Sequence, residues 1–187
     1  MDNEINIHEY LDSLIAKGQN YFTSDEVLKG TNLQEKSVSV SLSRLAKKGR
    51  IKMIRFGFGL ILNPYAGELH PSYYLDKMMK FLETKYYVGL LSAAAYWGAS
   101  HQSSMAYQVI CDKILRPIKF EKGRIEFISK QLTFSEVGVE RVSGVGGYFL
   151  ISSPELTSID LLRFPKKVGH LNNIATILED LTEKWEQ

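Results

Sequence analysis

The 187-residue sequence predicts an α+β fold that is divided into two domains. Helical periodicity dominates the first third, strand-like runs fill the middle, and an apolar helical stripe closes the chain. Charge is also uneven, because residues 36–55 contain seven Lys/Arg and no Asp or Glu although the formal net charge of the chain is only +2. Asn63-Pro64 breaks the pattern after this basic segment. We therefore expect domains over 1–63 and 64–187.

Three helices and a β-hairpin are expected in the first domain. Apolar periodicity followed by glycine predicts helices over 5–17, 24–30 and 33–48, with Thr23 or Ser24 as the N-cap of the second. Two strands, 51–55 and 60–62, flank a Gly57-Phe58-Gly59 turn. Three helices followed by a β-ribbon are typical of a winged helix-turn-helix. The predicted fold class is therefore α+β, with an N-terminal winged helix-turn-helix followed by a mixed α+β C-terminal domain.

The second domain is expected to combine helices with a β-rich middle. Pro71 suits the first turn of a helix, and an Ala-rich helix spans 90–97. Ser153 and Pro154 are a good N-cap and first position for a further helix, and the last helix carries an apolar face from Leu171 to Leu181. The expected strands are 107–111, 118–120, 124–128, 134–142 and 148–151.

The third helix of the first domain has one apolar side and one side suited to DNA. At about 100° per residue, Val38, Leu42, Leu45 and Ala46 fall on one face that would pack on the first helix. Its four serines lower helix propensity, but their short side chains would let the helix lie deep in a major groove. A basic helix followed by a β-ribbon also suits the phosphate backbone. The alternative is an ordinary solvated helix end.

The candidate DNA-binding residues fall into three groups. Gln34, Arg44 and Val40 suit adenine, guanine or phosphate, and a thymine methyl, respectively. The full set of candidate groove residues, at the N-terminal part of a recognition helix, is Gln34, Lys36, Ser37, Val40, Ser41 and Arg44. Lys47, Lys48 and Arg50 are expected on phosphates, and Lys52 and Arg55 on the wing.

Composition excludes several other classes. No apolar run approaches the roughly 18 to 20 residues of a membrane span, and the N-terminus lacks the pattern of a signal peptide. The single cysteine, Cys111, excludes an internal disulfide framework and a cysteine-cluster metal site. The four histidines have no ligand spacing. We therefore expect a cytoplasmic protein that has no metal, cofactor or enzymatic activity and does not bind membranes.

Several motifs resemble the AbiEi-type antitoxins. Residues 37–51 together with Gly57-Phe58-Gly59-Leu60 resemble the winged helix of that family. Residues 86–98 are similar to its Tyr and Ser-Ala-x-x-x-x-Gly helix, and 107–110 followed by Lys113 and Arg116 also resemble it. Residues 156–162 are similar to its Arg-Thr-x-x-Asp helix, although Leu156 stands where the arginine is usual. The resemblance covers about residues 20–180.

The resemblance implies a type IV antitoxin that is also a transcriptional autorepressor. Members of the family bind inverted repeats in their own promoter through the winged helix, so double-stranded DNA and a homodimer on it are the expected partners. They also counteract a nucleotidyltransferase-like toxin, AbiEii, in phage-defence (abortive infection) operons without forming a stable complex with it. The C-terminal domain is the part associated with antitoxicity.

Two other functions are compatible with parts of the sequence. Asp112, Glu126 and Lys130 are the candidates for a Mg²⁺-dependent nuclease, although the Glu-x-Lys spacing is absent. The glycine-rich run 142–147 has no lysine or helix after it, so a hairpin is expected there rather than a phosphate loop. Aromatic residues crowd the start of the second domain and indicate either core packing or the pocket of a ligand-responsive repressor; they are Tyr73, Tyr74, Tyr86, Tyr87, Tyr96, Trp97 and Tyr107.

Overall fold

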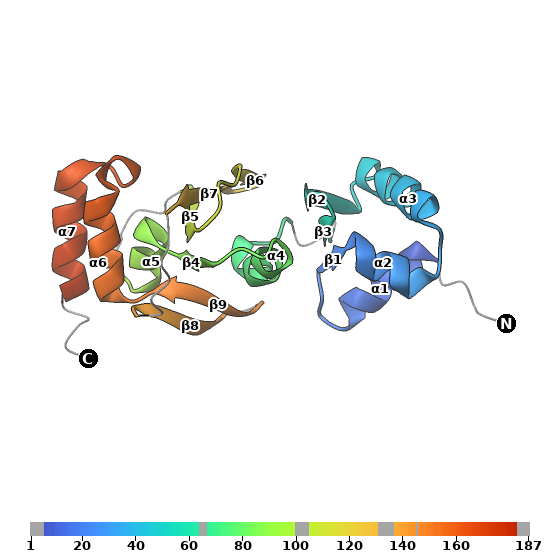
Figure 1. The fold of residues 1–187 in the computed structure, drawn as a ribbon, viewed down its shortest axis with the longest axis horizontal. Coiled ribbons are helices and arrows are strands. Elements are labelled where there is room, and N and C mark those ends of the chain that lie inside the picture. The colour runs from blue at the N-terminus through green and yellow to red at the C-terminus, as the bar shows by residue number, and fades with distance from the viewer. Residues whose placement is uncertain (1–5, 64–66, 100–104, 131–136, 145, 183–187) are drawn as a thin grey trace. The chain divides into compact units, whose positions relative to one another are not determined.

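The computed structural model describes residues 6–63, 67–99, 105–130, 137–144 and 146–182 (Figure 1). The chain divides into two units, Met1–Leu69 and His70–Gln187. Each unit has its own sheet. The domain boundary expected at Asn63-Pro64 falls at an edge of the described residues, since Pro64 lies outside them, and it stays a prediction.

The first unit contains three helices and a three-stranded sheet in the strand order β1-β3-β2. Its elements are α1 (Ile7–Ala16), β1 (Tyr21–Thr23), α2 (Ser24–Thr31), α3 (Glu35–Lys47), β2 (Ile51–Arg55) and β3 (Phe58–Ile61). The three predicted helices are confirmed to within two residues at each described end. β1 was not predicted, because this short strand forms through antiparallel pairing with β3, which lies far away in the sequence.

Local hydrogen bonds explain where these helices begin. The Asn6 side chain accepts from the His8 N–H at 3.2 Å and caps α1. Thr23, rather than Ser24, caps α2 through a capping box, in which Thr23 Oγ1 accepts from the Glu26 N–H at 3.1 Å and Glu26 accepts from the Thr23 N–H at 2.8 Å. Both orphan donors at this helix end are therefore satisfied.

The turn of the hairpin lies one residue earlier than the sequence predicted. Phe56 and Gly57 form it, and Gly57 has the positive φ of 78° that favours glycine. Phe58 was expected within the turn but begins β3, where it is buried and stacks on Tyr21 at 5.8 Å between ring centroids. Phe56 is fully exposed in its place. Phe58 belongs to the sheet because it pairs with Thr23 of β1. This pairing cannot be predicted from the local sequence.

The second unit is built on a six-stranded mixed sheet in the order β6-β7-β5-β4-β9-β8. β5 pairs with β7, and β4 with β9, in parallel, whereas the remaining neighbours are antiparallel. The strands are β4 (Tyr86–Val88), β5 (Ala106–Cys111), β6 (Ile118–Phe120), β7 (Gly123–Ser129), β8 (Val139–Gly144) and β9 (Gly147–Ser152). The helices are η1 (Pro71–Tyr73), α4 (Leu75–Phe81), α5 (Leu90–Tyr96), α6 (Pro154–Arg163), η2 (Pro165–Lys167) and α7 (His170–Thr182).

Most of the expected elements of this unit are present. Ser153 caps α6 as predicted, and the glycine-rich run joins β8 to β9 in an antiparallel hairpin in which Gly144 pairs with Gly147. Pro71 begins a single 3₁₀ turn, and the α-helix starts only at Leu75. β4, at the centre of the sheet, was missed. The first residues of the strand expected over 134–142 lie outside the described residues.

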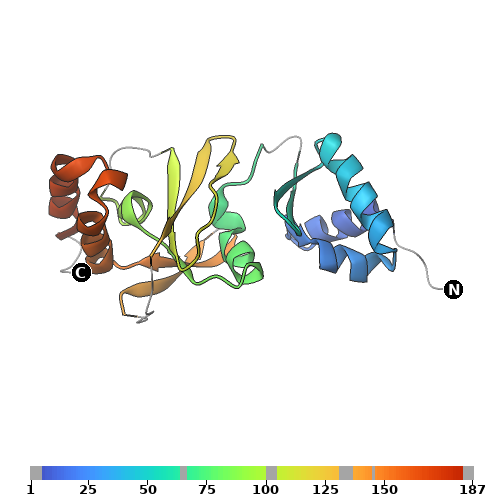
Figure 2. The same ribbon diagram turned by 45° about the horizontal axis from the view of Figure 1, so that its top comes forward.

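Different helices pack on the two faces of this sheet. Side chains alternate along β4, so Tyr87 projects to one face whereas Tyr86 and Val88 project to the other. α6 and α7 lie on one side of the sheet and α4 on the other (Figure 1 and Figure 2). Tyr87 and Ile110 belong to the apolar core on the α6 side. Tyr86 donates to Asp76 of α4 at 3.1 Å.

We expect Thr23→Ala to destabilise the start of α2 by about 1 kcal/mol, because the Glu26 N–H loses its acceptor. Amide hydrogen exchange in α2 should then become about fivefold faster. Ser24→Ala is the matched control and should leave exchange unchanged, since the Ser24 side chain does not cap the helix. Equal acceleration in both variants would contradict the assignment of Thr23 as the cap.

Candidate functional site

The buried face of α3 determines which of its side chains reach the surface. Val38, Leu42 and Leu45 are buried in the core of the first unit, and Ala46 packs partly against it. The face predicted from the helical angle is therefore confirmed. Because these residues face α1 and the sheet, the polar and basic side chains of α3 project outward.

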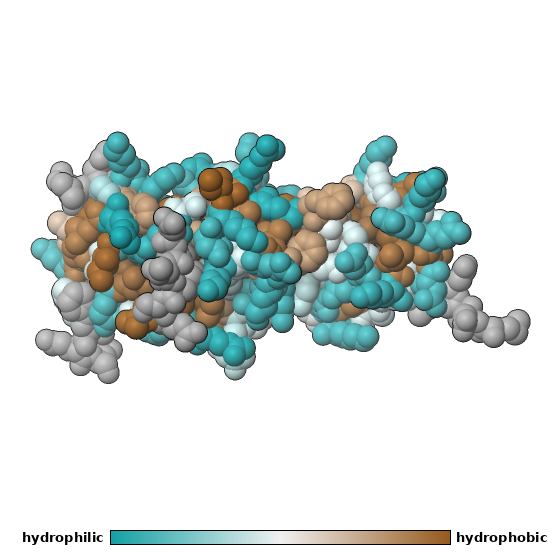
Figure 3. Space-filling model, viewed as in Figure 1, coloured by the Kyte–Doolittle hydropathy of each residue, from teal (hydrophilic) through white to brown (hydrophobic). Residues whose placement is uncertain are grey.

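The predicted DNA-binding residues lie at the surface or only partly below it. Gln34, Lys36, Ser37, Val40, Arg44, Lys47 and Lys48 are exposed, whereas Ser41, Arg50, Lys52 and Arg55 are half-buried. Hydrophilic residues cover much of α3 on the face that Figure 3 shows. Their contact with DNA stays a prediction.

Two of the basic residues are paired with acids from outside the acid-free segment. Arg50 contacts Asp12 of α1 at 3.0 Å, and Lys52 contacts Glu68 at 2.5 Å. By contrast, no described residue forms an ion pair with the four basic residues of the α3 region: Lys36, Arg44, Lys47 and Lys48. Four basic side chains without an ion-pair partner among the described residues therefore lie on α3 and at its C-terminal end.

Two of these cations lie next to the N-terminus of α1. Arg44 and Lys48, one helical turn apart, line a small surface hollow together with Asn6 and His8. Unpaired backbone N–H groups at a helix N-terminus carry partial positive charge. This part of the surface therefore brings two cationic side chains close to the positive end of the α1 dipole, an arrangement that suits an anionic ligand.

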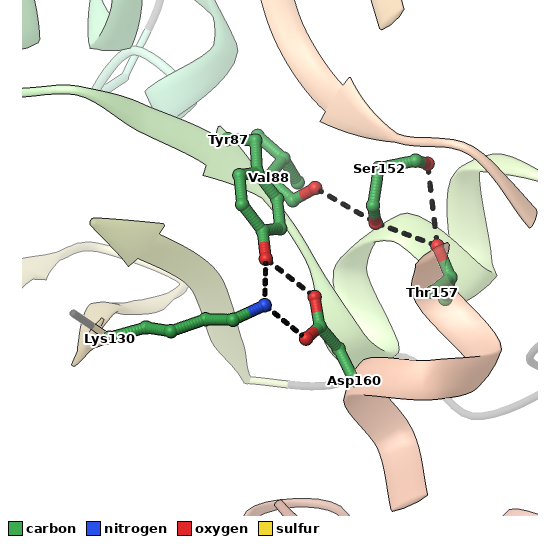
Figure 4. A network of polar contacts seen from close by, with 6 residues as sticks. All are labelled: Tyr87, Val88, Lys130, Ser152, Thr157 and Asp160. Carbon is green, nitrogen blue, oxygen red and sulfur yellow. Dashed lines mark hydrogen bonds and ion pairs between the residues drawn. The ribbon is translucent and has the colours of Figure 1, made fainter. Parts of the chain in front are cut away.

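A buried polar network links three elements of the second unit (Figure 4). The Tyr87 hydroxyl of β4 donates to Asp160 Oδ2 of α6 at 2.6 Å. Lys130, just after β7, donates through Nζ to Asp160 Oδ1 at 2.8 Å and to the Tyr87 hydroxyl at 3.0 Å. Asp160 is fully buried. Burial, reinforced by the Asp160 carboxylate, raises the pKa of Tyr87 well above its ordinary value, so this hydroxyl stays protonated and donates.

Neighbouring hydrogen bonds connect α5 and α6 to the sheet. The hydroxyls of Ser152 and Thr157 lie 2.7 Å apart, and Ser152 Oγ donates to the Val88 carbonyl at 3.4 Å (Figure 4). Trp97 Nε1 donates to the Ser152 carbonyl at 2.8 Å. Thr157 and Asp160, which belong to the motif in 156–162, therefore have internal structural contacts. Their roles were not foreseen: the partners of Asp160 are 73 and 30 positions away, and Thr157 contacts Ser152 only because α6 folds back on β9.

The nuclease candidates do not converge. Glu126 pairs with Gln108 in the β5–β7 register, four positions from Asp112, which corresponds to about 13 Å along a strand. Glu126 also contacts Lys167 at 2.7 Å, and Lys130 is engaged by Asp160. Within the described ranges, no three His, Cys, Asp or Glu side chains are grouped to hold a metal ion. The same residues include no helix long and apolar enough to cross a membrane.

The architecture is that of a mixed α+β protein with seven α-helices and two sheets in its described part. Residues 87–187 match the family model of the AbiEi antitoxin C-terminal domain. The match spans more than half of the chain, so this chain belongs to the AbiEi antitoxin family. The resemblance predicted from 86–98, 107–116 and 156–162 is thereby confirmed. No curated protein matches the chain.

The family match establishes the general class of function. The second unit is an antitoxin domain, which places the chain in toxin–antitoxin systems. The family is not a family of enzymes.

We expect Lys130→Met to lower the free energy of unfolding of the second unit by about 3 kcal/mol, because it leaves the buried Asp160 carboxylate without its cation. Urea unfolding followed by tryptophan fluorescence measures the change. Lys80→Met is the matched control: its ion pair with Asp76 is largely exposed on the lysine side, so the loss should stay below about 1 kcal/mol. Equal losses in both variants would contradict a stabilising role for the network.

Proposed function

We propose that this protein is a DNA-binding antitoxin and autorepressor of a type IV toxin–antitoxin system. The antitoxin domain over 87–187 supports the first role. The observation that carries the second is the outward face of α3, where Lys36, Arg44 and Lys48 lie unpaired among the described residues while the opposite face is buried. In this proposal, the first unit acts as a winged helix-turn-helix.

The proposed docking places α3 in a major groove. Gln34, Val40 and Arg44 face base edges, and Lys47 and Lys48 contact phosphates. Arg50 and Lys52 contribute less to binding, since each is already paired with an acid of its own unit. Two copies of the chain span an inverted repeat in the protein's own promoter, and each reads one half-site.

The proposed target of the antitoxin domain is a nucleotidyltransferase-like toxin from the same phage-defence operon. The toxin is counteracted without a stable complex between the two proteins. The separate cores of the two units support a division of labour, with repression in the first unit and antitoxicity in the second.

We expect Arg44→Ala to weaken promoter binding by about 1–3 kcal/mol and to relax the preference at one base pair. Lys48→Ala should weaken binding to all sequences and reduce the salt slope by about 1, because one phosphate contact is lost. Fluorescence anisotropy at several salt concentrations measures both effects. Lys52→Ala is the comparison variant and should reduce the slope less than Lys48→Ala, because Glu68 already engages this lysine. An unchanged slope for Lys48→Ala would overturn the docking.

We also expect the two roles to separate in cells. A variant that combines Arg44→Ala and Lys48→Ala should lose repression of a promoter reporter but still rescue growth when the adjacent toxin gene is induced, because both substitutions lie on the surface of the first unit. Protein levels are matched by expression from an unrelated promoter. Loss of rescue at equal protein levels would contradict the division of labour.

A further inference from the structure

The second unit contains a pocket of about 440 Å³ on the face of the sheet opposite the Tyr87–Lys130–Asp160 network. Val88, Phe149 and Ile151 line it from β4 and β9, and α5 contributes Ser92, Ala95 and Tyr96. α4 covers the neighbouring part of this face, where Tyr86 contacts Asp76. The pocket lies beside the part of the face that α4 covers. Its volume is in the range of small-molecule sites.

Aromatic rings line this pocket in two groups. His70 makes edge-to-face contacts with Tyr107 at 5.1 Å and with Phe120 at 6.2 Å between ring centroids. Tyr96 makes a similar contact with Phe149 at 5.9 Å. All five rings belong to the lining. Such surfaces favour a flat aromatic ligand, whose own ring can stack or pack edge-on against them.

The lining is neutral. Among the described residues that line the pocket, none is Asp, Glu, Lys or Arg. Burial and the nearby Lys122 lower the pKa of His70, so its imidazole is uncharged at neutral pH. A charged ligand would therefore lose its hydration without gaining an ion pair, which is costly. This observation favours an uncharged occupant.

Two polar groups remain available to orient a ligand. The Tyr107 hydroxyl makes no hydrogen bond with any described residue, although much of its side chain is covered. His70 Nδ1 lies 2.9 Å from Ser72 Oγ and accepts from the Ser72 N–H at 3.3 Å, whereas Nε2 has no hydrogen-bond partner among the described residues. A pocket with apolar walls and a few such groups is the common form of a small-molecule site.

We propose that this pocket binds an uncharged aromatic molecule of one or two rings, with Tyr107 as its hydrogen-bond partner. The proposal goes beyond antitoxicity and autorepression and does not depend on DNA binding. It adds a small-molecule site to the antitoxin domain, and Ser72 of η1 and its N-cap residue His70, from the same unit, belong to that site.

The direct test is an NMR titration of the full chain with indole as the probe. We expect methyl shift changes concentrated at Val88, Ala95 and Ile151, intermolecular NOEs to the Ala95 methyl, and a Kd below about 1 mM. Benzoate, which is charged, should bind at least tenfold more weakly. Shift changes outside the pocket, no saturation by 10 mM indole, or equal affinity for benzoate would each overturn the proposal.

Two substitutions locate the site. Ala95→Trp fills the pocket from an exposed helix position and should weaken indole binding at least tenfold, whereas Ala175→Trp, at an exposed position of α7, should leave it unchanged. Tyr107→Phe should weaken indole more than 1-methylindole, which has no N–H to donate. If Ala95→Trp does not fold, the site is tested by the intermolecular NOEs and by the comparison of indole with 1-methylindole on Tyr107→Phe. Equal effects of both tryptophan substitutions, or of Tyr107→Phe on both probes, would contradict the assigned site.

Discussion

The contact on which the second unit depends is the buried pairing of Asp160 with Lys130 and Tyr87. A fully buried carboxylate is tolerated only when its hydrogen-bonding capacity is satisfied. Here β4, the end of β7 and α6 each supply one member, so the network forms only when all three are in place. It fixes α6 on one face of the sheet, and the Ser152–Thr157 contact reinforces that position. The opposite face is left partly uncovered, and the aromatic pocket lies there.

The first unit is governed by a simpler constraint, the apolar face of α3. Burial of Val38, Leu42 and Leu45 forces the cations of this helix outward. Acids from α1 and from the end of the unit balance the charges of Arg50 and Lys52, but none of the described acids balances Arg44 or Lys48. Positive charge is thus concentrated on one helix of a protein whose formal net charge is only +2. This contrast underlies the proposed interface with DNA.

The sequence predicted the features that depend on local signals. Helical periodicity, glycine stops and caps located the helices, and the glycine-rich run located the β8–β9 hairpin. It missed β1 and β4, which pair only with strands far away in the sequence, whereas β6, equally short, was predicted beside its hairpin partner β7. The sequence also predicted Phe58 in a turn, because its pairing with β1 cannot be inferred from the neighbouring residues. The ion pairs Arg50–Asp12 and Lys130–Asp160 join residues at least 30 positions apart, so charge counts within a segment could not reveal them.

The central claim is that a member of the AbiEi antitoxin family uses its first unit to repress its own promoter. The most direct measurement is the affinity of the full chain for its own upstream DNA and for scrambled DNA of equal length, over a series of salt concentrations. We expect tight binding to the upstream DNA, much weaker binding to the scrambled DNA, and a salt slope that reflects several phosphate contacts. Equal and strongly salt-dependent binding to both would contradict it.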